Sequence, residues 1–71
     1  MRNAIASERV RLGISQAELG EMVGKDRSQI SRLESNPLAA DGKMLCELSR
    51  IFSCSVDYLL GLSEERTPKY A

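Results

Sequence analysis

The chain has 71 residues, which suffices for one domain with one small hydrophobic core. Ten lysines and arginines balance ten aspartates and glutamates, so net charge gives no argument for a polyanionic partner, and any nucleic-acid surface must be argued from local side-chain placement. The two cysteines, Cys46 and Cys54, occur without histidine and without CxxC spacing, which argues against metal-binding and disulfide frameworks and favours a reducing cytoplasm.

Apolar residues recur at helical spacing along most of the chain, and alternating β-branched runs are absent. The fold class is therefore predicted to be all-α, with one domain over residues 1–62. Residues 63–71 are charged, contain proline and lack periodicity, so we expect a mobile tail there. Neither a membrane span nor a secretory pattern is present, so we expect a soluble protein that is not exported.

The first helix is predicted over about residues 3–12 and ends at Gly13. Ile5 and Leu12 are expected to face the core. Arg9 lies on the same stripe, so it either has an acidic partner or lies at the solvated edge of the stripe.

The second helix is predicted over residues 16–23, because Ser15 and Glu18 have the spacing of a capping box and Gly24 can end the helix. The buried stripe is expected to consist of Leu19, Met22 and Val23. Gly20 costs about 1 kcal/mol relative to alanine inside a helix, which suggests close packing against another element.

The third helix is predicted over about residues 27–35, with Asp26 as its N-cap. At about 100° per residue, one side carries Ile30, Leu33 and Glu34. The opposite side carries two arginines, three hydroxyls and no acid: Arg27, Ser28, Ser31, Arg32 and Ser35. A solvated helix surface usually mixes acidic and basic residues, so this face is better suited to phosphate oxygens and base edges.

The remaining chain predicts two more helices. Asn36 and Pro37 close the third helix, and residues 38–40 are expected to form a loop. Asp41 caps a fourth helix whose apolar face consists of Met44, Leu45, Leu48, Ile51 and Phe52. Cys46 is expected on the exposed side of this helix and Cys54 in the interior. A short last helix is predicted over residues 56–60, ending at Gly61.

Several positions keep the spacing of a known family: Arg9, Gly13, Ser15, Gln16, Glu18, Leu19, Gly24, the run Ile30–Glu34 and the run Val56–Gly61. The chain resembles, over about residues 3–62, the lambda-repressor-like helix-turn-helix family, which includes phage repressors, Cro proteins and XRE-type bacterial regulators. The resemblance implies a compact five-helix DNA-binding domain with the helix-turn-helix at its second and third helices.

The resemblance also implies roles for individual residues. Gln16, at the start of the second helix, is expected to hydrogen-bond a DNA phosphate. The side chains expected to read base edges in the major groove are Arg27, Ser28, Ser31 and Arg32. Further phosphate contacts are expected from Lys25, Ser35 and Asn36. The family pairs the arginine of the first helix with the glutamate that ends the third, which makes Arg9 and Glu34 partners.

Three features depart from the family's pattern. Lys25 replaces an apolar residue after the turn glycine; its stem is expected to cover the turn while its ammonium reaches a phosphate. Ser35 and Asn36 replace a frequent Asn-Gly. Asp26 places a negative charge beside the groove, where it caps the helix but repels a nearby phosphate.

The predicted function is a sequence-specific regulator of transcription, expected to be a repressor, that binds a near-palindromic double-stranded operator as a homodimer. The protein is expected to be bacterial or phage-encoded and to act in the cytoplasm. Arg27 and Arg32 are the main specificity candidates, because a bidentate arginine to guanine is the commonest specific contact. Three apolar residues either complete the core or form the dimer interface: Leu59, Leu60 and Leu62. No cofactor, metal or small-molecule ligand is expected.

Two alternatives belong to other classes of protein. The chain could be a protein-interaction module, such as an antitoxin or an adaptor, that uses an apolar C-terminal surface. An enzyme is disfavoured, because without histidine or a phosphate-cradling glycine loop no nucleophile and base can be assembled. Cys46 is either a redox sensor or an incidental surface cysteine.

Overall fold

The computed structural model describes residues 4–66. Over these residues the regular structure is helical throughout, with five α-helices and one 3-10 helix: α1 (Ala4–Arg11), α2 (Gln16–Val23), α3 (Arg27–Ser35), η1 (Pro37–Ala39), α4 (Gly42–Phe52) and α5 (Val56–Leu59). The all-α prediction is confirmed, and α1, α2, α3 and α5 lie within one residue of their predicted bounds. The loop expected at residues 38–40 is wrong in part, because η1 begins at Pro37, whose ring favours the first position of a helical turn.

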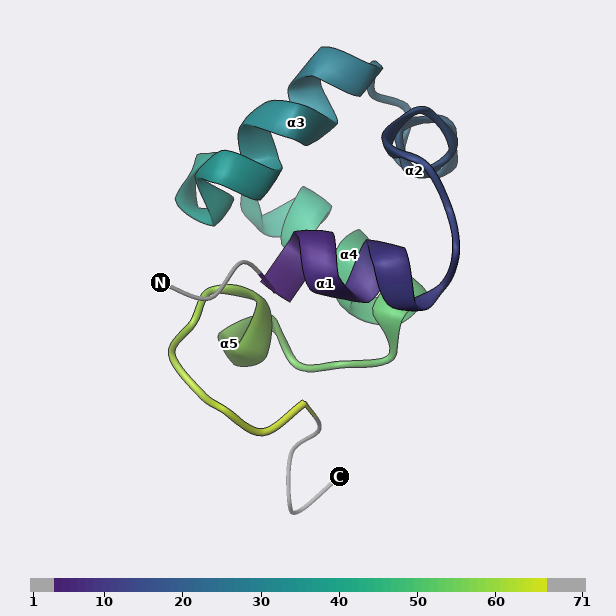
Figure 1. Cartoon of the computed structure of the whole chain (residues 1–71). Coiled ribbons are helices and arrows are strands. Elements are labelled where there is room, and N and C mark those ends of the chain that lie inside the picture. The colour runs from purple at the N-terminus through teal and green to yellow at the C-terminus, as the bar shows by residue number, and fades with distance from the viewer. Residues whose placement is uncertain (1–3, 67–71) are drawn as a thin grey trace.

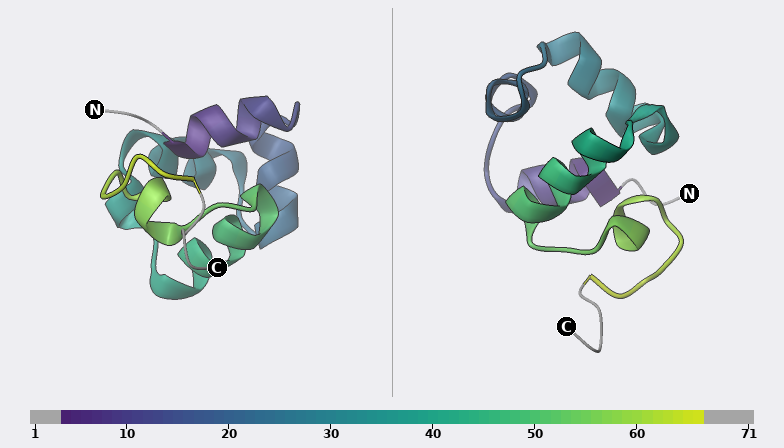
Figure 2. Two further views of the ribbon diagram at one scale, coloured as in Figure 1. Left: turned by 90° about the horizontal axis from the view of Figure 1, so that it is seen from below. Right: turned by 180° about the vertical axis from the view of Figure 1, so that it is seen from behind.

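The domain is arranged around two helices that cross at its middle, α1 and α4. In Figure 1, α2 and α3 lie together at the top, α1 crosses α4 in the middle and α5 lies below. The right-hand view of Figure 2 shows the reverse side, with α4 in front of α1. One side of α3 is therefore packed against the domain, and its other side faces outward.

Side-chain caps fix where the helices begin. The predicted capping box of α2 is present: Ser15 Oγ accepts from the Glu18 amide at 3.0 Å, and Glu18 Oε1 accepts from the Ser15 amide at 2.8 Å. Asp26 and Gln29 form a second capping box at α3, with distances of 2.8 and 3.0 Å. Satisfied amides at both N-termini hold α2 and α3 to fixed starting points.

The connection between α2 and α3 is tight for two reasons. Gly24 has φ of 71°, a left-handed conformation that favours glycine. Gly20 is buried, and a Cβ there would collide with the backbone carbonyl of Lys25. The close packing predicted for Gly20 is thus confirmed, although the segment that approaches it is the turn at Lys25 and not a crossing helix.

The core is aliphatic around one phenylalanine. Its fully buried side chains are Phe52, Ile5, Leu19, Ile30, Leu48 and Leu59. Two expectations were wrong: Leu12 is 40% exposed and Met22 is 53% exposed. Leu12 lies beyond the end of α1, where the chain turns away. The buried side of α2 is centred among Leu19, Gly20 and Val23, so Met22 lies about 110° from its centre at roughly 100° per residue.

Glu8 on α1 is a buried acid that contacts the C-terminal segment of the described residues. Its carboxylate accepts from Arg66 at 2.6 and 2.9 Å and from Arg11 at 2.9 Å. The hydrogen bond from Arg66, aided by Arg11, lowers the pKa of Glu8, although burial acts in the opposite direction.

The backbone carbonyl of Arg66 also accepts from the Ser55 amide at 2.5 Å. These contacts lie beyond the domain boundary expected after Leu62. The rest of the expected mobile tail, residues 67–71, lies outside the described residues.

Candidate nucleic-acid interface

The two sides of α3 differ as its helical phase predicts. Ile30, Leu33 and Glu34 are buried. The five polar residues of the opposite side are all exposed: Arg27, Ser28, Ser31, Arg32 and Ser35. Such a surface provides cationic and hydroxyl donors without helping to form the core, so these side chains are accessible to a partner.

The first half of α3 shares a hollow with the start of α2. Its lining consists of Gln16, Asp26, Arg27, Ser28 and Ser31. The structure thus brings Gln16 beside three of the four predicted base-reading side chains. An arginine, two hydroxyls and a carboxamide can together donate to phosphate oxygens and to acceptors on base edges.

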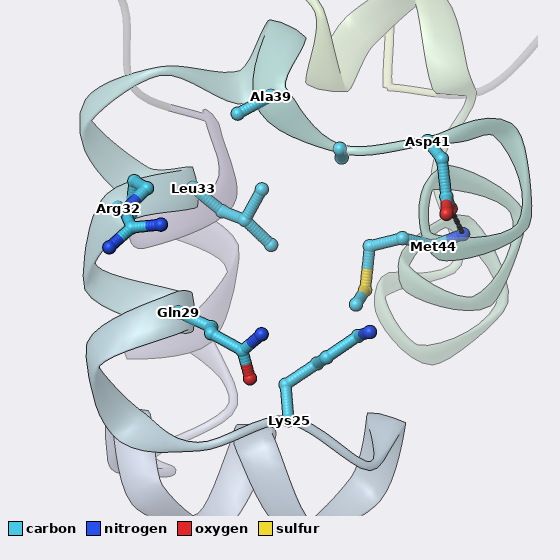
Figure 3. A pocket seen from close by; sticks show the side chains of 8 residues that line it. Lys25, Gln29, Arg32, Leu33, Ala39, Asp41 and Met44 are labelled. Atoms are coloured by element: carbon cyan, nitrogen blue, oxygen red, sulfur yellow. Dashed lines mark hydrogen bonds between the residues drawn. The ribbon is translucent and has the colours of Figure 1, made fainter.

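Arg32 lies instead on the opposite flank of α3, at a second hollow shown in Figure 3. This hollow lies between α3 and the start of α4, and its walls include Lys25, Gln29, Leu33 and Met44. The Lys25 side chain extends into it toward Met44 rather than toward the Gln16 hollow (Figure 3). Two cationic side chains, Lys25 and Arg32, therefore share this hollow with the Asp41 carboxylate, which caps α4.

The remaining predicted phosphate contacts lie at the far end of α3. Ser35 is its last residue and Asn36 follows it, and both are exposed. Neither lines the hollows described above. The predicted interface is therefore spread along the whole length of α3.

Asp26 is occupied by its capping role. The same oxygen, Oδ1, accepts from the Gln29 amide at 2.8 Å and from the Ser28 hydroxyl at 3.2 Å. These bonds partly satisfy the carboxylate that was expected to repel a phosphate. They also mean that Ser28 must rotate its hydroxyl before it can donate to a base.

A hydrogen-bonded network lies behind the Gln16 hollow. Arg9 Nε donates to Glu34 Oε2 at 2.6 Å, so the pairing implied by the resemblance is present in the structure. Gln16 Nε2 donates to the other carboxylate oxygen, Oε1, at 3.0 Å. Arg9 Nη1 donates to the carbonyl of Ile14, just before α2, at 2.9 Å. The network joins α1, α2 and α3.

One residue and one contact of this region were not predicted from the sequence. Gln29 both closes the capping box of α3 and lines the second hollow; its spacing from Asp26 is the same signal that was used for Ser15 and Glu18. The bond between Gln16 and Glu34 spans 18 residues of sequence, and no local pattern announces it.

The three leucines considered for a dimer interface differ in how far they are buried. Leu59 is 1% exposed and belongs to the core, which places it out of reach of a second chain. Leu60 is half-buried, whereas Leu62 is 74% exposed. Cys46 is exposed and Cys54 is buried, as predicted.

Between residues 4 and 66, no cluster of three or more histidine, cysteine or acidic side chains is placed to hold a metal ion. No helix in this part of the chain is long and apolar enough to span a membrane.

The chain is similar in sequence to a helix-turn-helix family and to two regulators. A helix-turn-helix family model matches residues 5–59. The chain is 42% identical over 60 residues to repressor protein C2 of Salmonella phage P22, covering 84% of this chain but only 28% of that relative. It is 29% identical over 65 residues to an uncharacterized HTH-type transcriptional regulator, YgzD, of Bacillus subtilis (strain 168), covering 92% of this chain and 98% of that one.

A solved structure has the same fold. It is a crystal structure of the P22 c2 repressor in complex with synthetic operator 9T in the presence of Tl+. The two structures match with a TM-score of 0.77 and 39% sequence identity, over 86% of this chain and 92% of that chain. With a family model that matches most of its length, this chain belongs to the helix-turn-helix family.

Proposed function

We propose that the chain binds double-stranded DNA sequence-specifically and represses transcription, with α3 in the major groove. The observation that carries the proposal is the exposed polar side of α3 on a fold shared with a repressor solved on its operator. Because the chain spans about a quarter of the C2 repressor's length, activities of that longer protein outside the shared domain are not carried over.

The proposed base contacts come from both flanks of α3. Arg27, Ser28 and Ser31 read base edges near the start of the helix, and Arg32 reads from the opposite flank, one helical turn further along. The phosphate contacts that position the helix come from Gln16, Lys25, Ser35 and Asn36. Lys25 makes its contact from the second hollow, beside Arg32.

One α3 covers few base pairs, so the active species is a homodimer on a near-palindromic operator, with two recognition helices about 34 Å apart. Leu60 and Leu62 are the accessible members of the apolar C-terminal set and form part of its interface. The protein acts in the cytoplasm, where its operator lies. Sedimentation that finds only monomer, both free and on DNA, would contradict the dimer.

Selection of bound duplexes from a random pool tests the function. The parent chain is expected to enrich one sequence with approximate twofold symmetry. The variant Arg27→Ala/Arg32→Ala is expected to lose that enrichment, while Arg50→Ala, which removes an exposed arginine in the last turn of α4, is expected to keep it. If no sequence is enriched and a protein partner co-purifies instead, the chain is an interaction module.

A further inference from the structure

We infer that Glu34 is a positioning residue for DNA binding, whose buried carboxylate turns the Gln16 carboxamide so that it offers an N–H, and not its oxygen, to a DNA phosphate. The inference rests on the proposed function. It adds to that function a residue that touches no DNA and acts only through Gln16.

The placement of Glu34 is the first step. Glu34 is only 7% exposed, and each of its carboxylate oxygens has one polar donor. Oε2 faces Arg9, inside the domain, and Oε1 faces Gln16, which lines the hollow at the start of α3. The carboxylate thus links a cation behind the site to an amide at its surface.

The chemistry of the two groups sets the orientation of the amide. An ionised carboxylate only accepts hydrogen bonds, so it binds the NH2 end of the carboxamide and repels the oxygen end. One N–H of Gln16 is used by Glu34, and the second N–H remains available as a donor. Without the carboxylate, both orientations of the amide become accessible, and one of them presents an oxygen to the phosphate.

Arg9 makes this arrangement rigid. It donates to Glu34 at 2.6 Å and to the Ile14 carbonyl at 2.9 Å, so the carboxylate and the chain entering α2 share one anchor. A buried ion pair is weak evidence for stability alone, and a role in fixing geometry is a recognised alternative. A donor fixed before binding loses little side-chain entropy when the phosphate arrives.

A double-mutant cycle on the duplex selected above tests the inference. Gln16→Met keeps the side-chain length and removes the amide; it is expected to weaken binding about tenfold, the size of one hydrogen bond to a charged group. Glu34→Gln is expected to weaken binding by roughly threefold to tenfold in the parent and to have no further effect in the Gln16→Met background. An equal loss in both backgrounds would overturn the inference, because a purely structural defect does not depend on Gln16.

A chemical probe identifies the phosphate itself. Single methylphosphonate substitutions along the duplex remove one charged oxygen at a time. One position is expected to weaken binding of the parent but not of Gln16→Met, and Glu34→Gln is expected to lose sensitivity at that same position. Retained sensitivity in Glu34→Gln would contradict the inference.

Controls separate folding from positioning. Arg9→Met removes the anchor of the carboxylate but not its bond to Gln16. It is expected to lower the melting temperature and to weaken binding less than Glu34→Gln does, with sensitivity retained at the same phosphate. If Glu34→Gln does not fold, Glu34→Asp, which keeps the charge but withdraws it by one methylene, replaces it in the same cycle. A parent chain that selects no duplex would refute the proposed function, whereas additive losses on a selected duplex would refute only the role of Glu34.

Discussion

Glu8 and Glu34 are both buried glutamates, but they lie on different helices and their partners differ. Glu8 accepts from Arg11 and Arg66, whose side chains are 47% and 38% exposed, and both of these arginines also donate to the Phe52 carbonyl. Glu34 accepts from one arginine, Arg9, which is 17% exposed, and from a neutral amide.

The difference shows how one kind of residue can serve two purposes. Both arginines at Glu8 bind its carboxylate and the Phe52 carbonyl. Through Arg66, these bonds hold the C-terminal segment against α1 and the end of α4. At Glu34, a single cation satisfies one oxygen, and the other oxygen is left to act on a side chain of the candidate interface. Substitutions around Glu8 are therefore expected to change stability alone. Substitutions around Glu34 are expected to change both stability and DNA binding.

The largest effect is expected for Arg9→Ala. The change leaves Glu34 buried without a cation, which is expected to lower the free energy of unfolding by about 3 kcal/mol in urea denaturation. Arg11→Ala is the matched control, because Glu8 keeps Arg66 and Arg11 itself is half-exposed. We expect a loss below about 1 kcal/mol. Equal losses for the two variants would remove the contrast between the two acids.

The next effect concerns the outer side of α3. Arg27→Ala and Arg32→Ala are each expected to reduce discrimination at one base position by about 1–3 kcal/mol, with unfolding free energies unchanged. Because the two arginines lie on opposite flanks, their effects are expected to add within about 0.5 kcal/mol. Competition binding with single-base variants of the selected duplex measures both quantities. Relaxed preference at the same position in both variants would contradict the separation of the flanks.

A pH dependence is expected around Glu8. The pKa of Glu8 is lowered in the folded protein, mainly by Arg66, so its contribution to stability is present above the ordinary glutamate pKa of about 4.3 and is lost as pH falls through the lower, folded value. Arg66→Ala is expected to melt at a lower temperature than the parent at pH 7. Melting curves across the acidic range are expected to converge as Glu8 becomes protonated. A difference that stays constant down to pH 2 would show that Arg66 acts through packing and its bond to the Phe52 carbonyl, and not through Glu8.

The sequence predicted helices well wherever local chemistry decides them. The Ser15 and Glu18 box, the Asp26 cap and the Gly24 turn each involve residues a few positions apart, and α2 and α3 begin and end where these signals place them. The polar side of α3 followed from helical phase alone. Capping and phase are local, so they can be predicted from the printed sequence.

What was missed depends on contacts distant in sequence. Glu8 and Arg66 are 58 positions apart, and nothing near either residue indicates the other. Leu12 and Met22 were assigned to the core by spacing, but the buried side of a two-turn helix is set by the elements that pack on it. Helical phase places Arg27 and Arg32 about 140° apart, at the two edges of the polar side of α3. The hollow beside Arg32, however, is completed by α4, whose position no helical phase can supply.

The smallest expected effect is a change in thiol labelling. Cys54 is 6% exposed, and burial together with the charge of Glu8 raises the pKa of its thiol, so a thiol reagent at pH 8 is expected to modify Cys46 quickly and Cys54 only when the structure opens. Arg66→Ala removes a contact that holds the chain beside Cys54, so labelling of Cys54 is expected to accelerate. Cys46, on α4, provides the internal control, and its rate is expected to stay constant. If DNA binding also survives full modification of Cys46, that cysteine is not a redox sensor. An unchanged labelling rate of Cys54 in Arg66→Ala would mean that the Arg66 side chain is not needed to keep Cys54 covered. The comparison of the two acids would then depend only on the variants of Arg9 and Arg11.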